Sequence, residues 1–231
     1  MVLRRPVRHP SSRSVNEFKN LCNLPVAEIF FTADSPEQYK SGGGKMGKII
    51  LVTGAARSGK STFAEQYVAK YGKNIGYIAT AQVLDEEMRF RVALHRKRRP
   101  ANWTTYEAPF DTHLALKEAG KNCDMVLFDC LTMFLSNILC TMENLESSER
   151  NYQVVKEKLD LLIAQAQENE GTTVFVSNEV GSGIVPDNHM AREYRDISGL
   201  VNQTVAKVAD SVYLVVCGIP VDVKKLKEKL L

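Results

Sequence analysis

The sequence predicts an α/β fold, in which a mostly parallel, twisted sheet carries helices on both faces. From residue 48 onward, five short apolar runs alternate with longer segments of helical periodicity. Strands that are apolar almost throughout are typical of a sheet covered on both faces. The alternation of strand and helix favours parallel neighbours. A glycine-rich segment at the first strand–helix junction agrees with this fold class.

Each expected strand is a short run of β-branched, aromatic and other apolar residues that ends at a polar residue or a turn. These runs cover residues 49–53, 75–79, 125–129, 173–177 and 211–216. The expected helices lie between them, at residues 61–71, about 84–98, about 110–121, about 131–141, 148–169 and 189–209. The helix at 148–169 repeats apolar residues at a spacing that forms one face.

The glycine-rich segment at residues 54–61 fits the pattern G-x-x-x-x-G-K-S. In this pattern, backbone N–H groups surround phosphates at the N-terminus of a helix. We expect Lys60 to reach the β- and γ-phosphates and the Ser61 hydroxyl to bind Mg²⁺. An ordinary glycine-rich turn is the alternative. The strand before the segment and the helix after it favour a P-loop NTPase-like fold that binds a nucleoside triphosphate.

The first 45 residues differ in composition from the rest of the chain. They contain four prolines, several serines and a Ser-Gly-Gly-Gly run, which are typical of a flexible linker. The first thirteen residues are rich in arginine and lack the apolar core of a secretory signal. We therefore expect an extension or linker at 1–45 and a nucleotide-binding catalytic domain at 46–231. For residues 1–45, we rank an extension, with Met46 as the natural first residue, ahead of a targeting segment.

Composition excludes several classes of protein. The 231 residues are 44% hydrophobic and 25% charged, typical of a globular protein. No apolar run approaches the ~20 residues of a membrane helix, so we expect no membrane span. The five cysteines lack C-x-x-C spacing, which indicates a reduced, cytoplasmic compartment and neither a zinc site nor a disulfide framework. A net charge of +3 is too small to indicate nucleic acid as a partner.

Polar residues follow the carboxyl ends of the expected strands. Besides the glycine-rich segment, they are Thr80, Gln82, Asp129 and the pair at 178–179. In open parallel sheets, ligands bind beyond these strand ends, so we expect the four groups to surround one crevice. Asp129 closes an apolar strand, as does the carboxylate that holds Mg²⁺ in P-loop enzymes. The alternative is that Asp129 caps the following helix.

His95 lies among cations near the end of the expected helix at 84–98. It shares a helix face with Met88 and Val92, and the basic run 96–99 follows directly. Neighbouring cations disfavour protonation of an imidazole, and a neutral imidazole is nucleophilic. Cations can also bind a triphosphate and stabilise a pyrophosphate leaving group. On these residues alone, a structural histidine or a solvated basic helix end remains open.

From about Met46 to its end, the chain resembles the bifunctional adenosylcobinamide kinase / adenosylcobinamide-phosphate guanylyltransferase family of cobalamin biosynthesis. The combination of matching stretches is far more specific than the phosphate loop alone. In order, they are residues 50–61, 77–82, 84–88, His95 with 99–103, 178–186 and 195–199. Residues 1–45 lie outside the resemblance.

The resemblance implies an enzyme with two reactions. A kinase step transfers the γ-phosphoryl group of ATP or GTP to the hydroxyl of the cobinamide aminopropanol arm. A guanylyltransferase step moves GMP from GTP onto a histidine, releases pyrophosphate, and passes the GMP to adenosylcobinamide phosphate to give adenosylcobinamide-GDP. We therefore expect GTP, ATP and Mg²⁺ as cofactors, adenosylcobinamide and its phosphate as substrates, and a homotrimer.

Carried over position by position, His95 matches the histidine that forms the GMP intermediate. We expect Lys60 to be catalytic as well, and Ser61 and Asp129 to hold Mg²⁺. The expected nucleotide-binding residues are Gly54, Ala55, Ala56, Arg57, Ser58, Gly59, Lys60, Ser61, Ile78, Ala79, Thr80, Arg96, Lys97, Arg98, Arg99, Glu107 and Asp129.

Three positions depart from familiar members of the family. Ala55 replaces a second glycine, so it needs a negative φ or some strain. Leu94 replaces a histidine that often precedes the nucleophile, and Asp129 stands where some members have glutamate. None of the departures removes a reacting group.

Three other functions compete with this interpretation. A monofunctional P-loop small-molecule kinase predicts ATP use and no covalent intermediate. A GTP-binding switch is disfavoured because the sequence contains no N-K-x-D motif for guanine. An RNA- or DNA-associated ATPase would use the arginines of residues 4–13, but such a basic run is more typical of a disordered, solvated tail.

Overall fold

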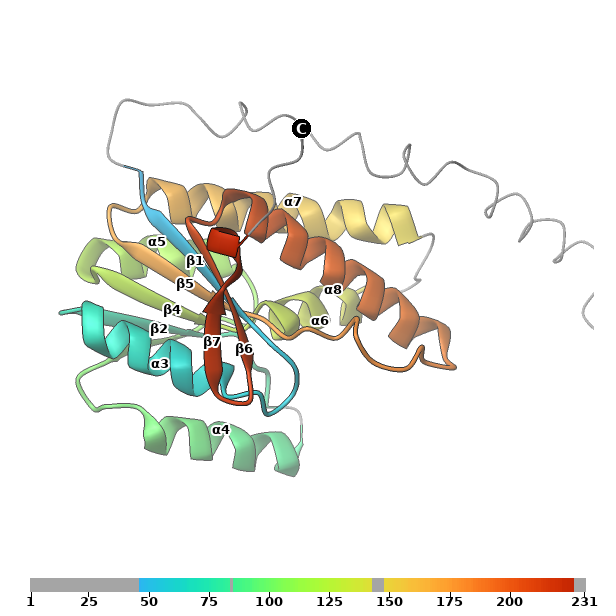
Figure 1. Cartoon of the computed structure of the whole chain (residues 1–231), viewed down its shortest axis with the longest axis horizontal. Helices are drawn as coiled ribbons and strands as arrows, with labels where there is room; N and C mark the ends of the chain where they lie inside the picture. Colours follow the sequence, from blue (N-terminus) through green and yellow to red (C-terminus); the bar gives the residue numbers. More distant parts are fainter. Residues whose placement is uncertain (1–45, 84, 143–147, 227–231) are drawn as a thin grey trace, which may run out of the picture. The chain divides into compact units, whose positions relative to one another are not determined.

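The computed structural model describes residues 46–83, 85–142 and 148–226, so the expected extension at 1–45 lies outside the described residues. One seven-stranded sheet forms the centre of the described part, in the order β3-β2-β4-β5-β1-β6-β7 (Figure 1). All neighbours pair in parallel except β7, which is antiparallel to β6. The strands are β1 (Lys48–Thr53), β2 (Ile75–Ala79), β3 (Thr104–Glu107), β4 (Met125–Asp129), β5 (Thr172–Val176), β6 (Ser211–Val216) and β7 (Ile219–Asp222).

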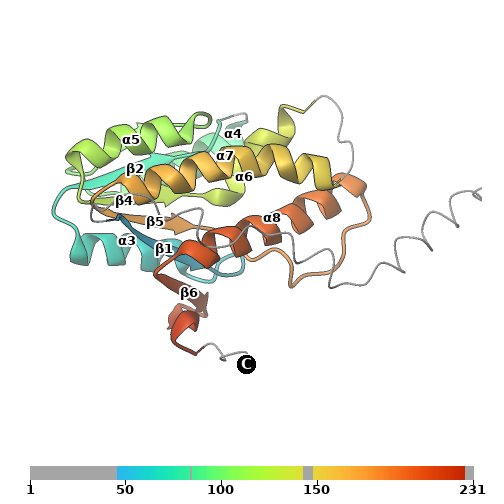
Figure 2. The same ribbon diagram turned by 90° about the horizontal axis from the view of Figure 1, so that it is seen from above.

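Helices cover both faces of the sheet. Figures 1 and 2 show α3 on one face and α5, α7 and α8 on the other. The helices are α3 (Lys60–Tyr71), α4 (Glu86–Arg98), α5 (Thr112–Asn122), α6 (Leu131–Cys140), α7 (Ser148–Glu168) and α8 (His189–Val208), and a 3₁₀ helix, η2, covers Val223–Leu226. The predicted fold class is confirmed. No helix of the described residues has the length and apolar character to cross a membrane.

The apolar character of the strands follows from this layering. In β1, Ile50 and Val52 pack against Ala64 and Val68 of α3. Because side chains alternate between the faces of a strand, the intervening residues point toward the opposite helical layer. The three inner strands β4, β5 and β1 therefore bury almost every residue.

Two strands were not predicted, and both lie at edges of the sheet. Strand β3 has the sequence TTYE and is largely exposed, so it has no apolar run. Strand β7 contains Pro220 and is also exposed. It follows a two-residue turn in which Cys217 and Gly218 have φ values of 52° and 81°. Two positive φ angles match the tight hairpin turn that suits twisted antiparallel strands, so β6 and β7 form a hairpin.

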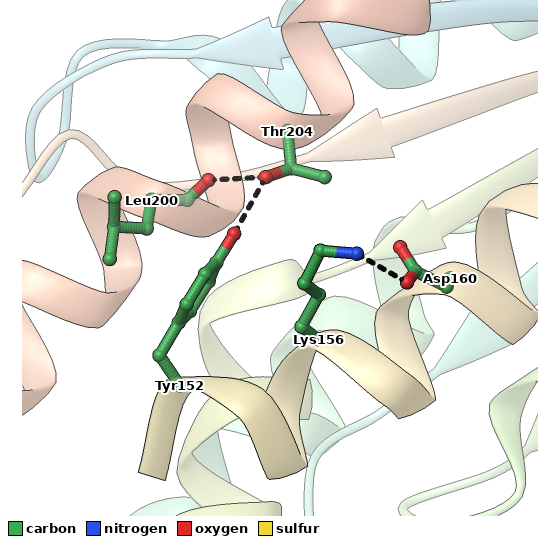
Figure 3. A network of polar contacts seen from close by, with 5 residues as sticks. All are labelled: Tyr152, Lys156, Asp160, Leu200 and Thr204. Carbon is green, nitrogen blue, oxygen red and sulfur yellow. Dashed lines mark hydrogen bonds and ion pairs between the residues drawn. The ribbon is translucent and has the colours of Figure 1, made fainter. Parts of the chain in front are cut away.

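Polar side chains join α7 to α8 (Figure 3). Thr204 Oγ1 donates to the Leu200 carbonyl at 2.9 Å, so the Tyr152 hydroxyl is the donor in its 3.0 Å bond to Thr204 Oγ1. Along α7, Lys156 Nζ contacts Asp160 Oδ2 at 2.7 Å. The bond between Tyr152 and Thr204 therefore links α7 to α8, whereas the pair of Lys156 and Asp160 lies within α7.

Candidate functional site

The loop between β1 and α3 has a conformation that requires glycine at two positions. Gly59 is the N-cap of α3 and has a φ of 94°, in the left-handed region that glycine adopts without strain. A Cβ at Gly54 would lie 2.6 Å from Ser58 Oγ and 2.6 Å from the carbonyl oxygen of Val215. The geometry of the loop therefore requires glycine at both of these positions of the G-x-x-x-x-G-K-S pattern.

Backbone hydrogen bonds hold this loop against both neighbouring strands. The amide of Glu179, after β5, donates to the Gly54 carbonyl at 3.0 Å. On the other side, Gly218 in the β6–β7 turn donates to the Ser58 carbonyl at 2.8 Å. Ala55 is not among the residues with positive φ, so it replaces glycine without strain, whereas Arg57 has a φ of 58°. The loop is thus ordered by its neighbours before any ligand binds.

Lys60 begins α3 and lies beneath this loop. Its side chain is buried, and Nζ donates to the Ala55 carbonyl at 3.2 Å. Burial lowers the pKa of Lys60, while the nearby acidic groups of Cys130 and Asp129 act in the opposite direction. Burial in turn raises the pKa of the Cys130 thiol to about 11. An ammonium group with one carbonyl partner and little water has a strong tendency to bind an anion.

The end of β2 contacts the end of β4. Thr80 accepts from the Cys130 amide at 2.7 Å through Oγ1 and donates to the Cys130 carbonyl at 3.0 Å. Its own amide donates to the Asp129 carbonyl at 3.2 Å. Buried Asn137 of α6 adds two bonds of 2.8 Å, to the carbonyls of Thr80 and Pro109. Sequence analysis missed Asn137, although an amide inside an apolar helix is a signal of this role.

The end of β5 joins the same group of residues. Asn178 Nδ2 donates to Thr132 Oγ1, at the start of α6, at 2.9 Å. Asn202 of α8 donates to the Asn178 carbonyl at 3.1 Å, and the Tyr194 hydroxyl donates to the Thr132 carbonyl at 3.1 Å. Gln82 reaches Asn137 at 3.0 Å. The expected clustering of polar strand ends is therefore present in the structure.

Asp129 ends β4, and its carboxylate accepts a hydrogen bond from the Tyr77 hydroxyl through Oδ2. The capping alternative is wrong, because the N-cap of α6 is Cys130 and no described side chain, that of Asp129 included, caps that helix end. Carboxylate and hydroxyl oxygens suit Mg²⁺, which takes one or two protein ligands and fills its other positions with water and phosphate. Asp129 and Ser61 fit that requirement. The described residues contain no cluster of three or more His, Cys, Asp or Glu that could hold a metal.

A second group of expected site residues lies in and after α4. Asp85 caps this helix by accepting from the Met88 amide at 2.7 Å, and Arg99 is its C-cap. His95 lies in the last turn, directly before Arg96. The side chains of His95 and Arg98 lie outside the described part of the structure. Lys97 is exposed.

An open hollow of about 360 Å³ lies beside the end of α4 and is lined by charged, aromatic and small residues. Arg96 pairs with Glu107 of β3 at 2.6 Å across its edge. The Arg99 guanidinium lies 3.4 Å from the centre of the Tyr77 ring, and its Nε and Nη1 atoms are buried without a partner in the described residues. The lining residues are Arg96, Arg99, Pro100, Ala101, Trp103, Thr105 and Glu107.

Two of the expected nucleotide-binding residues have buried side chains. Ile78 and Ala79 are buried inside β2, so their side chains offer no surface to a nucleotide. Only backbone atoms at these positions could take part. Within the phosphate loop, Ala55, Ala56 and Arg57 are exposed. Ser58 is buried, and its Oγ has no hydrogen-bond partner in the part of the chain that the structure describes.

Comparison with known proteins places the chain in a family. The family model for cobinamide kinase / cobinamide phosphate guanyltransferase matches residues 50–223. The bifunctional adenosylcobalamin biosynthesis protein CobU of Salmonella typhimurium is 42% identical over 183 residues, which are 76% of this chain and 99% of that protein. The CobU protein of Escherichia coli is 40% identical over 181 residues, 76% of this chain and 99% of that protein.

A third relative, the bifunctional adenosylcobalamin biosynthesis protein CobP of Pseudomonas aeruginosa, is 38% identical over 175 residues. The match covers 75% of this chain and 96% of that protein. These comparisons and the phosphate loop agree with each other and confirm the resemblance inferred from the sequence. The chain belongs to the cobinamide kinase / cobinamide phosphate guanyltransferase family.

Proposed function

We propose that this chain phosphorylates adenosylcobinamide and then transfers GMP to the resulting phosphate, with His95 as the residue that carries the GMP. The observation that carries the proposal is the family match over residues 50–223, shared with relatives named as bifunctional enzymes. A monofunctional kinase would not account for that match. The ordered phosphate loop and the basic end of α4 supply chemical groups for both reactions.

The kinase reaction uses the loop at residues 54–61. Its backbone N–H groups and the N-terminus of α3 bind the triphosphate, and Lys60 compensates the charge that develops during transfer. The cobinamide hydroxyl attacks the γ-phosphorus, its proton is lost, and the bond to the nucleoside diphosphate breaks. Ser61 and Asp129 are the residues that would hold Mg²⁺, which neutralises phosphate charge when bound.

The guanylyltransferase reaction uses the end of α4. The His95 imidazole attacks the α-phosphorus of GTP, which forms a P–N bond and releases pyrophosphate. A phosphate oxygen of adenosylcobinamide phosphate then attacks the same phosphorus and breaks the P–N bond. Arg96, Lys97 and Arg99 are cations near this step, and the two buried donors of Arg99 have no partner in the described residues. Such donors suit phosphate oxygens.

The remaining assignments extend this proposal. We infer a homotrimer from the family resemblance, and sedimentation equilibrium measures it directly. The cytoplasm is the compartment in which the free thiols of Cys123, Cys130, Cys140 and Cys217 would stay reduced. The proposal includes no nucleic-acid partner. Residues 1–45 lie outside both the described residues and the family match, so we expect a chain of residues 46–231 to retain both activities.

Radiolabelled GTP tests the function. Incubation with Mg²⁺ should give a protein adduct that is labile in acid and stable in alkali, as a phosphoramidate is. Addition of adenosylcobinamide phosphate should move the label to adenosylcobinamide-GDP. The adduct should be absent from the His95→Ala variant and present in the control His113→Ala, whose histidine lies in α5. Product formation without any adduct in the wild-type protein would overturn the two-step transfer.

A further inference from the structure

Tyr77 contacts both groups of site residues. It lies in β2 and is 2% exposed. Its hydroxyl donates to Asp129 Oδ2, and its ring lies under the guanidinium of Arg99. Resting on the proposed function, we propose that Tyr77 is a positioning residue for both reactions: its hydroxyl orients Asp129 for the kinase, and its ring holds Arg99 for guanylyl transfer.

The contact with Asp129 follows from the register of the sheet. Ala79 of β2 lies opposite Asp129 of β4. Tyr77 precedes Ala79 by two residues and therefore points to the same face. Its long side chain reaches along that face to the carboxylate at the strand end. A hydrogen bond to a charged oxygen is stronger than a neutral one, so the hydroxyl restricts the rotation of the carboxylate.

The contact with Arg99 fixes the end of α4. Arg99 is the C-cap of that helix, and its amide donates to the Arg96 carbonyl at 3.3 Å. Its guanidinium lies 3.4 Å from the Tyr77 ring centre, a cation–π contact. Trp103 stacks beside the same ring, with centroids 6.5 Å apart and planes inclined by 28°. Because no described oxygen accepts from Arg99 Nε or Nη1, the aromatic ring sets the plane of these donors.

A role in packing alone does not explain the hydroxyl. Phenylalanine would fill the same apolar space between β2 and Trp103. A buried phenol requires a hydrogen-bond partner, and most of the neighbouring core offers none. The partner here is the carboxylate expected to face the phosphate loop. The hydroxyl and the ring of one residue thus act on different reactions.

Two variants of the full chain separate these effects. Tyr77→Phe keeps the ring and removes the hydroxyl, so the kcat of the kinase step should fall about tenfold. The rate of GMP labelling, measured with GTP and no corrinoid, should fall less than threefold. Tyr77→Leu removes the ring as well, and both rates should fall at least tenfold.

Fluorescence of Trp103, the single tryptophan, gives a readout that does not depend on activity. Its emission should match the wild type in Tyr77→Phe and shift in Tyr77→Leu, because only the second variant changes the stacked ring. If Tyr77→Leu does not fold, Arg99→Lys replaces it. Lysine keeps the charge and lacks the planar fork, so labelling should slow at least tenfold.

The outcomes are distinct. A kinase kcat equal to wild type in Tyr77→Phe would refute the role of the hydroxyl. Labelling at the wild-type rate in Tyr77→Leu or Arg99→Lys would refute the role of the ring. Equal losses of both activities in Tyr77→Phe would indicate a structural role only. If the wild-type protein itself lacked kinase activity or labelling, the proposed function would be wrong instead.

Discussion

Replacement of Gly54 by alanine tests the geometry of the phosphate loop. The new methyl group would lie 2.6 Å from Ser58 Oγ and 2.6 Å from the carbonyl oxygen of Val215. Ser58 can respond by rotation of its side chain, whose oxygen has no hydrogen-bond partner among the described residues. The Val215 carbonyl cannot, because it belongs to β6, which pairs with both β1 and β7. The loop or the strand must therefore move.

The expected cost follows from these contacts. Overpacking of this kind lowers the free energy of unfolding by about 1–3 kcal/mol. For a domain of this size, each kcal/mol lowers Tm by about 2–4 °C. Displacement of the loop should also weaken nucleotide binding by about tenfold, which corresponds to about 1.4 kcal/mol. Urea unfolding measures the first effect, and titration calorimetry with a non-hydrolysable GTP analogue measures the second.

Gly199→Ala is the matched control. Gly199 lies in α8, and apart from the neighbouring backbone of that helix a Cβ there would meet no atom of the described residues within 4 Å. Alanine should raise the free energy of unfolding by about 0.5–1 kcal/mol, since glycine weakens a helix interior. Wild-type stability and GTP affinity in Gly54→Ala would show that the loop does not pack tightly against β6.

Three further results are expected. Ala55→Gly should retain activity and lose about 0.4–1 kcal/mol of stability, because Ala55 has negative φ and glycine increases the entropy of the unfolded chain; a gain in activity would contradict this. Lys60→Ala should lower kinase kcat/KM by about 10²–10³-fold, measured by steady-state kinetics, since a buried charge donor is lost. Burial raises the pKa of Cys130 from 9.0 to about 11, so the stability contributed by its neutral thiol should be lost as pH rises through that range. Urea unfolding midpoints measure this decline. The Cys130→Ala variant should show a smaller decline.

Much of the fold was predictable because its central strands are buried on both faces. Strands β2, β4 and β6 begin and end at the predicted residues, and each helix boundary differs by at most two residues. The edge strands β3 and β7 were missed because exposure removes the apolar pattern on which the prediction rests. Pairing with a neighbour through the backbone, which creates an edge strand, leaves little trace in side-chain composition.

The candidate site was predictable only in part. The phosphate loop has a local pattern, and Asp129 was found because it ends an apolar run. Tyr77 had no such signal, and the position of Asn137 inside an apolar helix does not identify its partners. Their roles arise from contacts with Asp129 and Thr80 across about fifty positions of sequence. Contacts of that kind depend on strand order, which a single sequence does not specify.

The central claim is that GMP becomes attached to the last turn of α4. Peptide mapping by tandem mass spectrometry, after brief exposure of the full chain to GTP and Mg²⁺ and digestion at alkaline pH, locates the modified residue. We expect one additional GMP mass on the peptide that contains His95, and its loss when adenosylcobinamide phosphate is added. GMP on a different residue, or an unmodified protein that still produces adenosylcobinamide-GDP, would contradict the account.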